Sequence, residues 1–176
     1  MLKIILLAVA ALLVIVLGLA ATKPDSFAVQ RSATVQAGPE KVVGLIDDFH
    51  QWRAWSPWEK LDPAMKTTFS GAERGPGAVY AWEGNSKVGA GRMEILEETP
   101  GKVTIKLDFI KPFEGHNVAE FVVTPQGAAT QVTWAMHGPT PFVSKIMQVF
   151  VSMDSLIGGD FERGLANLKT AAESGK

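Results

Sequence analysis

The side chains best placed for polar chemistry in this sequence are Arg31 and Glu83. Each has partly apolar neighbours two residues away along the chain, which is the pattern of a strand with one buried face. Either charge could therefore lie in an apolar cavity, where it would hold a ligand carboxylate or hydroxyl or polarise a carbonyl during catalysis. A structural ion pair, or a position at the edge of a sheet, also explains both residues.

The other titratable candidates form no recognisable catalytic or metal-binding pattern. His50 lies beside two aspartates, whereas His116 and His137 are expected near strand ends. No His-x-x-x-His pair, HExxH, G-x-S-x-G or Walker motif occurs, and the chain contains no cysteine. Gly89-Ala90-Gly91 lacks the third glycine of a dinucleotide fingerprint. We therefore expect no metal and no cofactor, and the sequence identifies no catalytic residue.

Five tryptophans provide aromatic surface at defined positions. Trp52, Trp55 and Trp58 are closely spaced, whereas Trp82 and Trp134 lie on predicted strands in phase with other apolar residues. The first three could wall a cavity mouth or touch lipid headgroups, because indole combines an apolar ring with a polar N–H group. Alternatively, they pack short helices against a sheet. For Trp82 and Trp134 the simplest interpretation is a place in the core.

The N-terminal segment predicts a membrane helix. Ile4 to Ala21 contains only apolar residues and glycine. A helix of that length covers about 27 Å, close to the ~30 Å of a bilayer core. We expect residues 1–23 to be an uncleaved anchor, with a cleaved signal peptide as the alternative. Lys3 favours a cytoplasmic start and an exported domain, although Lys23 and Arg31 weaken that charge argument.

Composition and charge limit the partners of the remaining chain. The net charge of the 176 residues is −1, and it becomes more negative when Lys3 and Lys23 are left out. Nucleic acid is therefore not an expected partner, because phosphate binding requires a basic face. Residues 24–26 are predicted to form a short tether, since Pro24 cannot continue the helix. Residues 27–173 have the usual size of one domain.

Hydrophobic periodicity then predicts the elements that position these side chains. Alternation of apolar and polar residues predicts strands over 27–36, 65–70, 78–83, 88–98, 102–109, 117–124 and 130–137. A helix should begin at Pro39 and a second short helix or loop should carry Phe49, Trp52 and Trp55. The spacing after Pro141 predicts a long C-terminal helical region that Gly158-Gly159 interrupts, either as a hinge for a movable lid or as a passive loop.

The order of these elements predicts an α+β fold, in which an antiparallel sheet of about six to seven strands curves around a long C-terminal helix. Several ordered sequence tracts carry a family resemblance. They are Phe27-Ala28-Val29-Gln30-Arg31, Pro39-Glu40-Lys41-Val42, the tract from Asp48 to Trp58, Tyr80-Ala81-Trp82-Glu83-Gly84-Asn85, Gly89 to Ile95, and Thr130-Gln131-Val132-Thr133-Trp134. Through them the chain resembles the polyketide cyclase/dehydrase branch of the START-related (SRPBCC) superfamily, the helix-grip fold.

This resemblance implies an elongated apolar cavity between sheet and helix that takes lipid-like, sterol-like or aromatic ligands. The ligand-binding residues we predict are Arg31, Trp55, Trp58, Trp82, Glu83, Met93 and Trp134. The first hypothesis is a membrane-anchored domain that binds a hydrophobic small molecule or a lipid. Two alternatives remain: a cyclase/dehydrase-type enzyme acting on an aromatic or polyketide-like substrate, and an interaction module whose own side chains fill the cavity. The fold alone does not decide among them.

Overall fold

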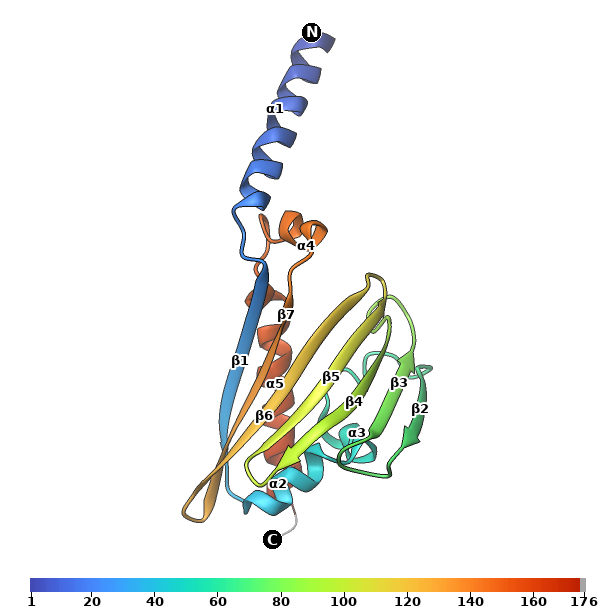
Figure 1. Ribbon diagram of the computed structural model, residues 1–176, viewed down its shortest axis with the longest axis vertical. Helices are drawn as coiled ribbons and strands as arrows, with labels where there is room; N and C mark the ends of the chain where they lie inside the picture. The colour runs from blue at the N-terminus through green and yellow to red at the C-terminus, as the bar shows by residue number, and fades with distance from the viewer. Residues whose placement is uncertain (175–176) are drawn as a thin grey trace.

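The computed structural model of the protein describes residues 1–174. The N-terminal helix α1 (Leu2–Ala21) projects from the rest of the chain as a single rod (Figure 1), and only Ala20 of this helix is buried. By length and composition α1 is able to cross a membrane. It ends before Pro24, as predicted, because proline lacks the amide hydrogen that a continuing helix needs.

The rest of the chain is built on one antiparallel sheet of seven strands in the order β1-β7-β6-β5-β4-β3-β2. The strands are β1 (Ser26–Val35), β2 (Lys66–Gly71), β3 (Ala78–Glu83), β4 (Ala90–Thr99), β5 (Lys102–Lys111), β6 (Gly115–Gln126) and β7 (Ala129–Pro139). Each strand from β2 to β6 pairs with the next along the chain, and β7 also pairs with β1. The predicted strands and α+β class are confirmed.

Alternation along β5 shows how the sheet obtains its two faces. Val103, Ile105 and Leu107 are buried, whereas Thr104 and Lys106 between them keep contact with solvent. Successive side chains of a strand point to opposite faces. The buried set therefore faces the helices and the polar set faces water, so the sheet has one apolar side on which a core or a cavity can form.

Two groups of helices lie beside the sheet, and all but the fourth α-helix of the chain, which contacts α1 instead, cover its apolar side. Between β1 and β2 lie α2 (Pro39–Ile46), the short 3-10 helix η1 (Phe49–Gln51) and α3 (Trp52–Trp55); after β7 follow α4 (Phe142–Met147) and α5 (Met153–Glu173). Figure 1 shows α5 running along the sheet from the end near α1 to the opposite end, where α2 lies. The sheet curves around α5, as predicted.

Trp52 and Trp55 pack the short helices against the sheet. Both side chains are almost completely buried and pack edge-on against Phe121 of β6. Their indole N–H groups donate hydrogen bonds to the carbonyl oxygens of Ile46 (2.9 Å) and Leu45 (2.8 Å). These two tryptophans therefore pack the short helices against the sheet, which was one of the three interpretations of the cluster.

The predicted break at Gly158-Gly159 is wrong, because α5 continues through both glycines. The interruption lies earlier, between the end of α4 and Ser152, whose hydroxyl accepts a hydrogen bond from the amide of Ser155 and caps α5 (3.1 Å). Gly158 instead allows the Arg31 side chain to lie directly against the helix backbone. A Cβ atom there would lie 2.2 Å from a guanidinium nitrogen of Arg31, so glycine lets this strand residue cross over the helix.

The antiparallel order brings particular strand ends together at the side of the sheet from which α1 leaves. We call this side the α1 edge. It contains the starts of β1, β2, β4 and β6 and the ends of β3, β5 and β7. The opposite edge carries α2 and the β6–β7 turn (Figure 1). Of the segments that flank these strand ends, those next to β1 and β7 lie closest to the base of α1, and those next to β3 and β2 lie farthest from it (Figure 1).

Candidate functional site

An aromatic cavity of about 220 Å³ lies between the apolar face of the sheet and the helices. Its wall combines residues of five strands with residues of α3, α5 and the loops that follow α3 and β3. The lining residues are Trp52, Ser56, Trp58, Glu59, Met65, Tyr80, Trp82, Lys87, Val88, Met93, Leu107, Phe109, Ala119, Trp134, Met136, Ile157 and Phe161. Most of them are aromatic or aliphatic, so the cavity is suited to an apolar ligand.

Stacked and edge-on aromatic rings give the cavity one rigid wall. Trp134 of β7 stacks on Phe161 of α5 with ring centres 4.2 Å apart and planes 4° apart. Trp58 meets Trp134 edge-on, with ring centres 5.6 Å apart. Such pairs stabilise beyond their buried area, by about 0.5–1.5 kcal/mol each. The rings thus hold one another in place and present fixed flat surfaces to a ligand.

A second aromatic pair lies toward the α1 edge. Trp82 of β3 meets Phe109 of β5 edge-on, with ring centres 5.9 Å apart, and the Trp82 indole donates a hydrogen bond to the carbonyl of Val88 (2.9 Å). Gly91 pairs with Trp82 across the two strands, and a Cβ atom at Gly91 would lie 2.4 Å from the indole ring. The glycine therefore makes room for Trp82 on the sheet.

The polar groups of the wall are few. The Tyr80 hydroxyl donates a hydrogen bond to a carboxyl oxygen of Glu59 at 2.5 Å. Burial, together with this bond to Glu59, raises the pKa of Tyr80, so the phenol stays protonated and remains a donor at neutral pH. Ser56 is buried in the wall, and Lys87 is exposed at the rim. This small set can orient a ligand but adds little charge.

Trp134 carries a buried donor that finds no acceptor among residues 1–174. Its side chain is almost completely buried and lines the cavity. The indoles of Trp52, Trp55 and Trp82, in contrast, all donate to backbone carbonyls. An unpaired buried donor costs about 1–3 kcal/mol. A ligand oxygen that reaches the indole would relieve this cost.

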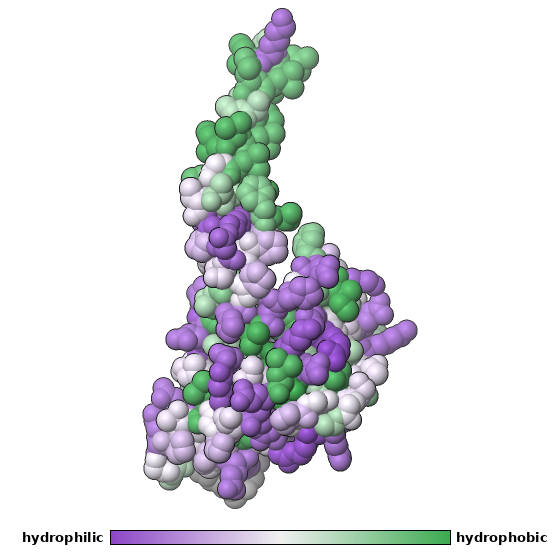
Figure 2. Space-filling view, viewed as in Figure 1, coloured by the Kyte–Doolittle hydropathy of each residue, from purple (hydrophilic) through white to green (hydrophobic). Residues whose placement is uncertain are grey.

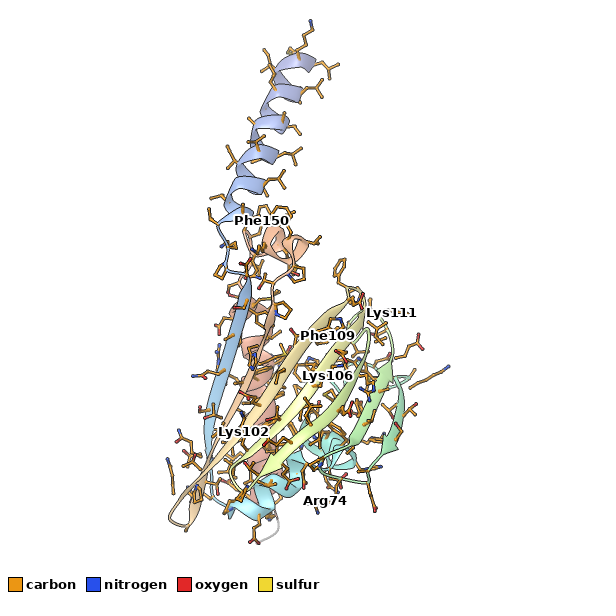
Figure 3. All side chains as sticks on the ribbon, in the orientation of Figure 1. Arg74, Lys102, Lys106, Phe109, Lys111 and Phe150 are labelled. Atoms are coloured by element: carbon orange, nitrogen blue, oxygen red, sulfur yellow. The ribbon has the colours of Figure 1, made fainter. Side chains whose placement is uncertain are left out.

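The cavity opens toward the α1 edge. Eight wall residues keep at least partial contact with solvent: Trp58 and Glu59 after α3, Trp82 on β3, and Met65, Lys87, Val88, Phe109 and Ile157. Met65 immediately precedes β2, Lys87 and Val88 lie between β3 and β4, and Phe109 lies near the end of β5. These four positions belong to the α1 edge (Figure 3, in which Phe109 is labelled). Deeper wall residues such as Leu107 and Ala119 are buried.

Four of the predicted ligand-binding residues line this cavity: Trp58, Trp82, Met93 and Trp134. Three others lie elsewhere. Trp55 is fully buried in the core behind Trp134. Glu83 is exposed at the end of β3, where it accepts a hydrogen bond from Lys111 at 2.8 Å. Arg31 lies on β1, outside the cavity wall.

Arg31 joins β1 to α5, through Asp154 in the first turn of the helix and Glu162 near its middle. Its guanidinium group donates to Asp154 at 2.7 Å and to Glu162 at 2.7 Å. These hydrogen bonds from Arg31 hold the pKa of Asp154 below its usual range. Arg31, which was predicted to bind a ligand, therefore pairs with two carboxylates of the protein itself.

Several wall residues were not singled out from the sequence, although a signal for them exists. Tyr80 is two residues before Trp82, and Phe109 is two residues after Leu107, so each shares a strand face with an apolar neighbour. Phe161 belongs to the apolar stripe of α5. What the sequence does not contain is which strands the helix crosses, and this decides which in-phase residues meet a cavity.

The histidines lie on the outside of the sheet or at a helix end. His116 pairs with Asp108 at 2.7 Å, and His50 pairs with Asp48 at 2.9 Å. Within residues 1–174 no group of three or more His, Cys, Asp or Glu side chains is arranged to hold a metal ion. A wide hollow of about 530 Å³ includes His116 and His137. It is shallow and open, so the aromatic cavity is the better candidate site.

Solved structures share this fold at low sequence identity. Protein MLL2253 from Mesorhizobium loti is 16% identical, with a TM-score of 0.60 over 85% of this chain and 99% of that one. The Aha1 dimer from Colwellia psychrerythraea is 15% identical, with a TM-score of 0.61 over 85% and 98%. The di-domain aromatase/cyclase (ARO/CYC) BexL from the BE-7585A biosynthetic pathway is 12% identical, with a TM-score of 0.63 over 90% and 54%. No curated protein matches the chain.

At these identities the solved structures establish the fold alone. The family comparison extends further, because one model matches the whole folded part of the chain, from the first residue of β1 to the last residue of α5. That match covers the sheet, the aromatic cavity and the long helix that closes it. By residues 26–173 the chain belongs to the family described as polyketide cyclase/dehydrase and lipid transport.

Proposed function

We propose that this protein is a membrane-anchored binding protein, which holds a small apolar molecule or one end of a lipid in the aromatic cavity. The observation that carries the proposal is an aromatic cavity that opens at the side of the sheet where a membrane-length helix ends. Its volume of about 220 Å³ is below the ~300–1,000 Å³ of sites for drug-sized ligands. This size favours a compact ring compound or the end of an acyl chain.

The polar groups of the wall refine the ligand class. The Trp134 indole N–H has no acceptor among residues 1–174, but its nitrogen has almost no accessible surface, so a ligand oxygen would reach it only if the wall rearranged. The remaining wall is almost entirely apolar, so a ligand with several charges would lose its hydration without compensation. A largely apolar molecule is therefore the best match.

The anchor gives this binding site access to its ligand. A domain fixed to a membrane experiences a high local concentration of every lipid-soluble compound in that membrane. We assign α1 as an uncleaved single-pass anchor and place the domain on the exported side, as the charge of Lys3 at the amino terminus suggests. The mass of the purified full-length product tests the first point, since a cleaved signal would remove about 20 residues.

A cyclase/dehydrase-type enzyme is the second candidate, because the family description includes that activity. Of the polar residues considered from the sequence, Arg31 and Glu83 lie outside the cavity wall. The role of proton donor would instead fall to Tyr80, whose hydroxyl is held by Glu59. Tyr80→Phe would then abolish turnover and leave ligand retention intact, whereas a binding protein shows no turnover in either form.

Blocking the cavity tests the binding proposal. Ala119 is a small, buried wall residue, and Ala119→Leu would fill part of the cavity. Ala135 of the neighbouring strand, which pairs with Gln30 and Glu120, is outside the wall, so Ala135→Leu is the matched control. Native mass spectrometry of full-length protein, extracted gently from its membrane, should show an apolar adduct in the wild type and the control.

In the Ala119→Leu variant the adduct should be lost while the circular dichroism spectrum stays unchanged. Retention of the adduct in Ala119→Leu would place the ligand elsewhere. Absence of an adduct from all three proteins, followed by no uptake of added fatty acids or small aromatic compounds, would favour the interaction module whose cavity needs no ligand.

A further inference from the structure

The segment between β7 and α5 exposes an unusual amount of apolar surface. Its large apolar side chains point to solvent in residues 142–151, and Phe150 is 72% exposed and Val143 is 66% exposed. We call Phe142, Val143, Met147, Phe150 and Val151 the α4 patch. A contiguous apolar patch of this kind usually marks a surface that another apolar body covers.

The only charged residue of segment 142–151 is withdrawn from the patch. Lys145 is mostly buried and pairs with Asp25 of the tether that follows α1. The backbone amide of Thr140 donates to the carbonyl of Asp25 at 2.7 Å. An ion pair and a backbone hydrogen bond therefore connect the tether, residues 24–26, to the segment that contains α4. These contacts hold the patch in a fixed position at the base of α1.

The α4 patch lies beside the end of the membrane-length helix. Residues of α4 contact α1, and Figure 3 shows Phe150 next to the lower end of α1. In Figure 2 apolar surface covers α1 and reappears at the upper end of the domain beside it. Because α1 ends at Ala21, a bilayer that contains this helix has its interface at the level of the patch.

A second exposed apolar group projects from the same edge of the sheet. Ile110 and Phe113 at the β5–β6 turn are 61% and 70% exposed. This turn belongs to the α1 edge, next to the wall residue Phe109. On the other side of the cavity mouth, Ile157 of the wall is one turn after the start of α5, which follows the α4 patch directly. The two apolar groups thus flank the mouth.

We propose that the α4 patch is inserted into the interfacial layer of the same bilayer that α1 crosses, and that it holds the cavity mouth against the membrane surface. This proposal rests on the proposed anchor function and extends it. The ligand then passes between bilayer and cavity without crossing bulk water. Apolar side chains at a membrane interface bind through buried area, as amphipathic segments do.

Charge complementarity contributes little to this docking. The basic residues near the α1 edge are Lys23, Lys66, Lys87, Lys111 and Lys145, and the acidic residues there are Asp25, Asp62, Glu83, Glu114 and Asp154. These groups balance, so no basic field attracts anionic headgroups. Docking should therefore be the same in neutral and anionic bilayers and should persist at high salt.

The absence of cysteine from the sequence allows single labels to test the proposal. We would reconstitute full-length Phe150→Cys, labelled with an environment-sensitive fluorophore, in phosphatidylcholine nanodiscs that contain spin-labelled lipids. The label should emit at shorter wavelength than in water, and the lipid spins should quench it several-fold. Phe113→Cys should show a weaker effect of the same kind. Gln126→Cys, exposed at the β6–β7 turn of the opposite edge, is the matched control and should show neither.

A label in α1, at Val9→Cys, separates this proposal from the anchor itself. If lipid spins quench the Val9 label but the Phe150 label stays in water, α1 is an anchor and the docking proposal is overturned. If the Val9 label is not quenched, the anchor fails, whatever the cavity binds. If the Phe150 label is shielded in native membranes but exposed in pure-lipid nanodiscs, a protein covers the patch and the bilayer proposal is equally overturned.

Discussion

The two halves of α5 are held to the sheet by different forces. From Phe161 to Ala172 the helix buries an apolar stripe that includes Leu165 and Leu168, and it packs into the centre of the core. From Met153 to Asp160 the only buried residue is Gly158, and the main polar attachment is the Arg31 ion pair. The second half is thus held mainly by hydrophobic burial, whereas the first half is held by the Arg31 ion pair and by two only partly buried side chains, Met153 and Ile157.

This difference matters because the weakly held half borders the cavity mouth. Ile157 lines the cavity, whereas its neighbours Leu156 and Gly159 are exposed. A region with few buried apolar contacts opens at lower free energy than the core does. The first half of α5 can therefore move to admit a ligand while the second half keeps the fold intact, and three predictions test this division.

The largest expected effect comes from removing apolar volume from the second half. Leu168 is completely buried, so Leu168→Ala should lower the free energy of unfolding by about 2–5 kcal/mol. The matched control in the first half, Leu156→Ala, removes a side chain that is 44% exposed. It should change stability by no more than about 0.5 kcal/mol. Denaturation of both full-length variants in one detergent, followed by circular dichroism, measures the difference; equal losses would contradict the division.

The sequence identifies the second half of α5 better than the first. Phe161, Leu165 and Leu168 recur at helical spacing, so their burial follows from the pattern. Gly158 and Gly159 suggested a break because glycine disfavours helices. The reason for Gly158 is the guanidinium group of Arg31, which reaches it from a strand more than one hundred residues earlier. Periodicity carries no information on such a contact.

The cavity shows the same limit. Trp82 and Trp134 were placed on the correct strands by alternation, and both line the wall. Arg31 and Glu83 were singled out because apolar residues flank them, yet both find charged partners near the surface. A strand pattern shows that two faces exist, but only the register and the crossing helix decide which positions meet the cavity.

A smaller effect is expected when the ion pair is removed. Arg31→Ala breaks the bonds to Asp154 and Glu162, and such exposed pairs contribute little to global stability. The loss of stability should therefore be smaller than that of Leu168→Ala. Amides of residues 153–160 should nevertheless exchange hydrogen several-fold faster, while those of residues 161–173 stay unchanged.

The matched control for this variant is Arg163→Ala. Arg163 pairs with Asp160 within the same helix, so its loss removes an ion pair but no attachment to the sheet. Exchange near Met153 should stay as in the wild type. If Arg31→Ala accelerated exchange evenly along the whole of α5, the two halves would form one cooperative unit and the comparison would fail.

The smallest effect is the response of the same half to acid. Arg31 holds the pKa of Asp154 below its usual range, so the stabilisation that this carboxylate provides is complete above about pH 4. It disappears as the pH falls through the lowered pKa of the folded state. Protection of the amides of residues 153–160 against hydrogen exchange, corrected for intrinsic exchange rates, should therefore fall when the pH is lowered from 6 to 3.

The control is Arg31→Ala. In this variant the protection of these amides is already low and should fall no further, because Asp154 then titrates alike in the folded and unfolded chain. An equal acid response in the two proteins would show that other carboxylates, and not this pair, control the attachment of the first half of α5.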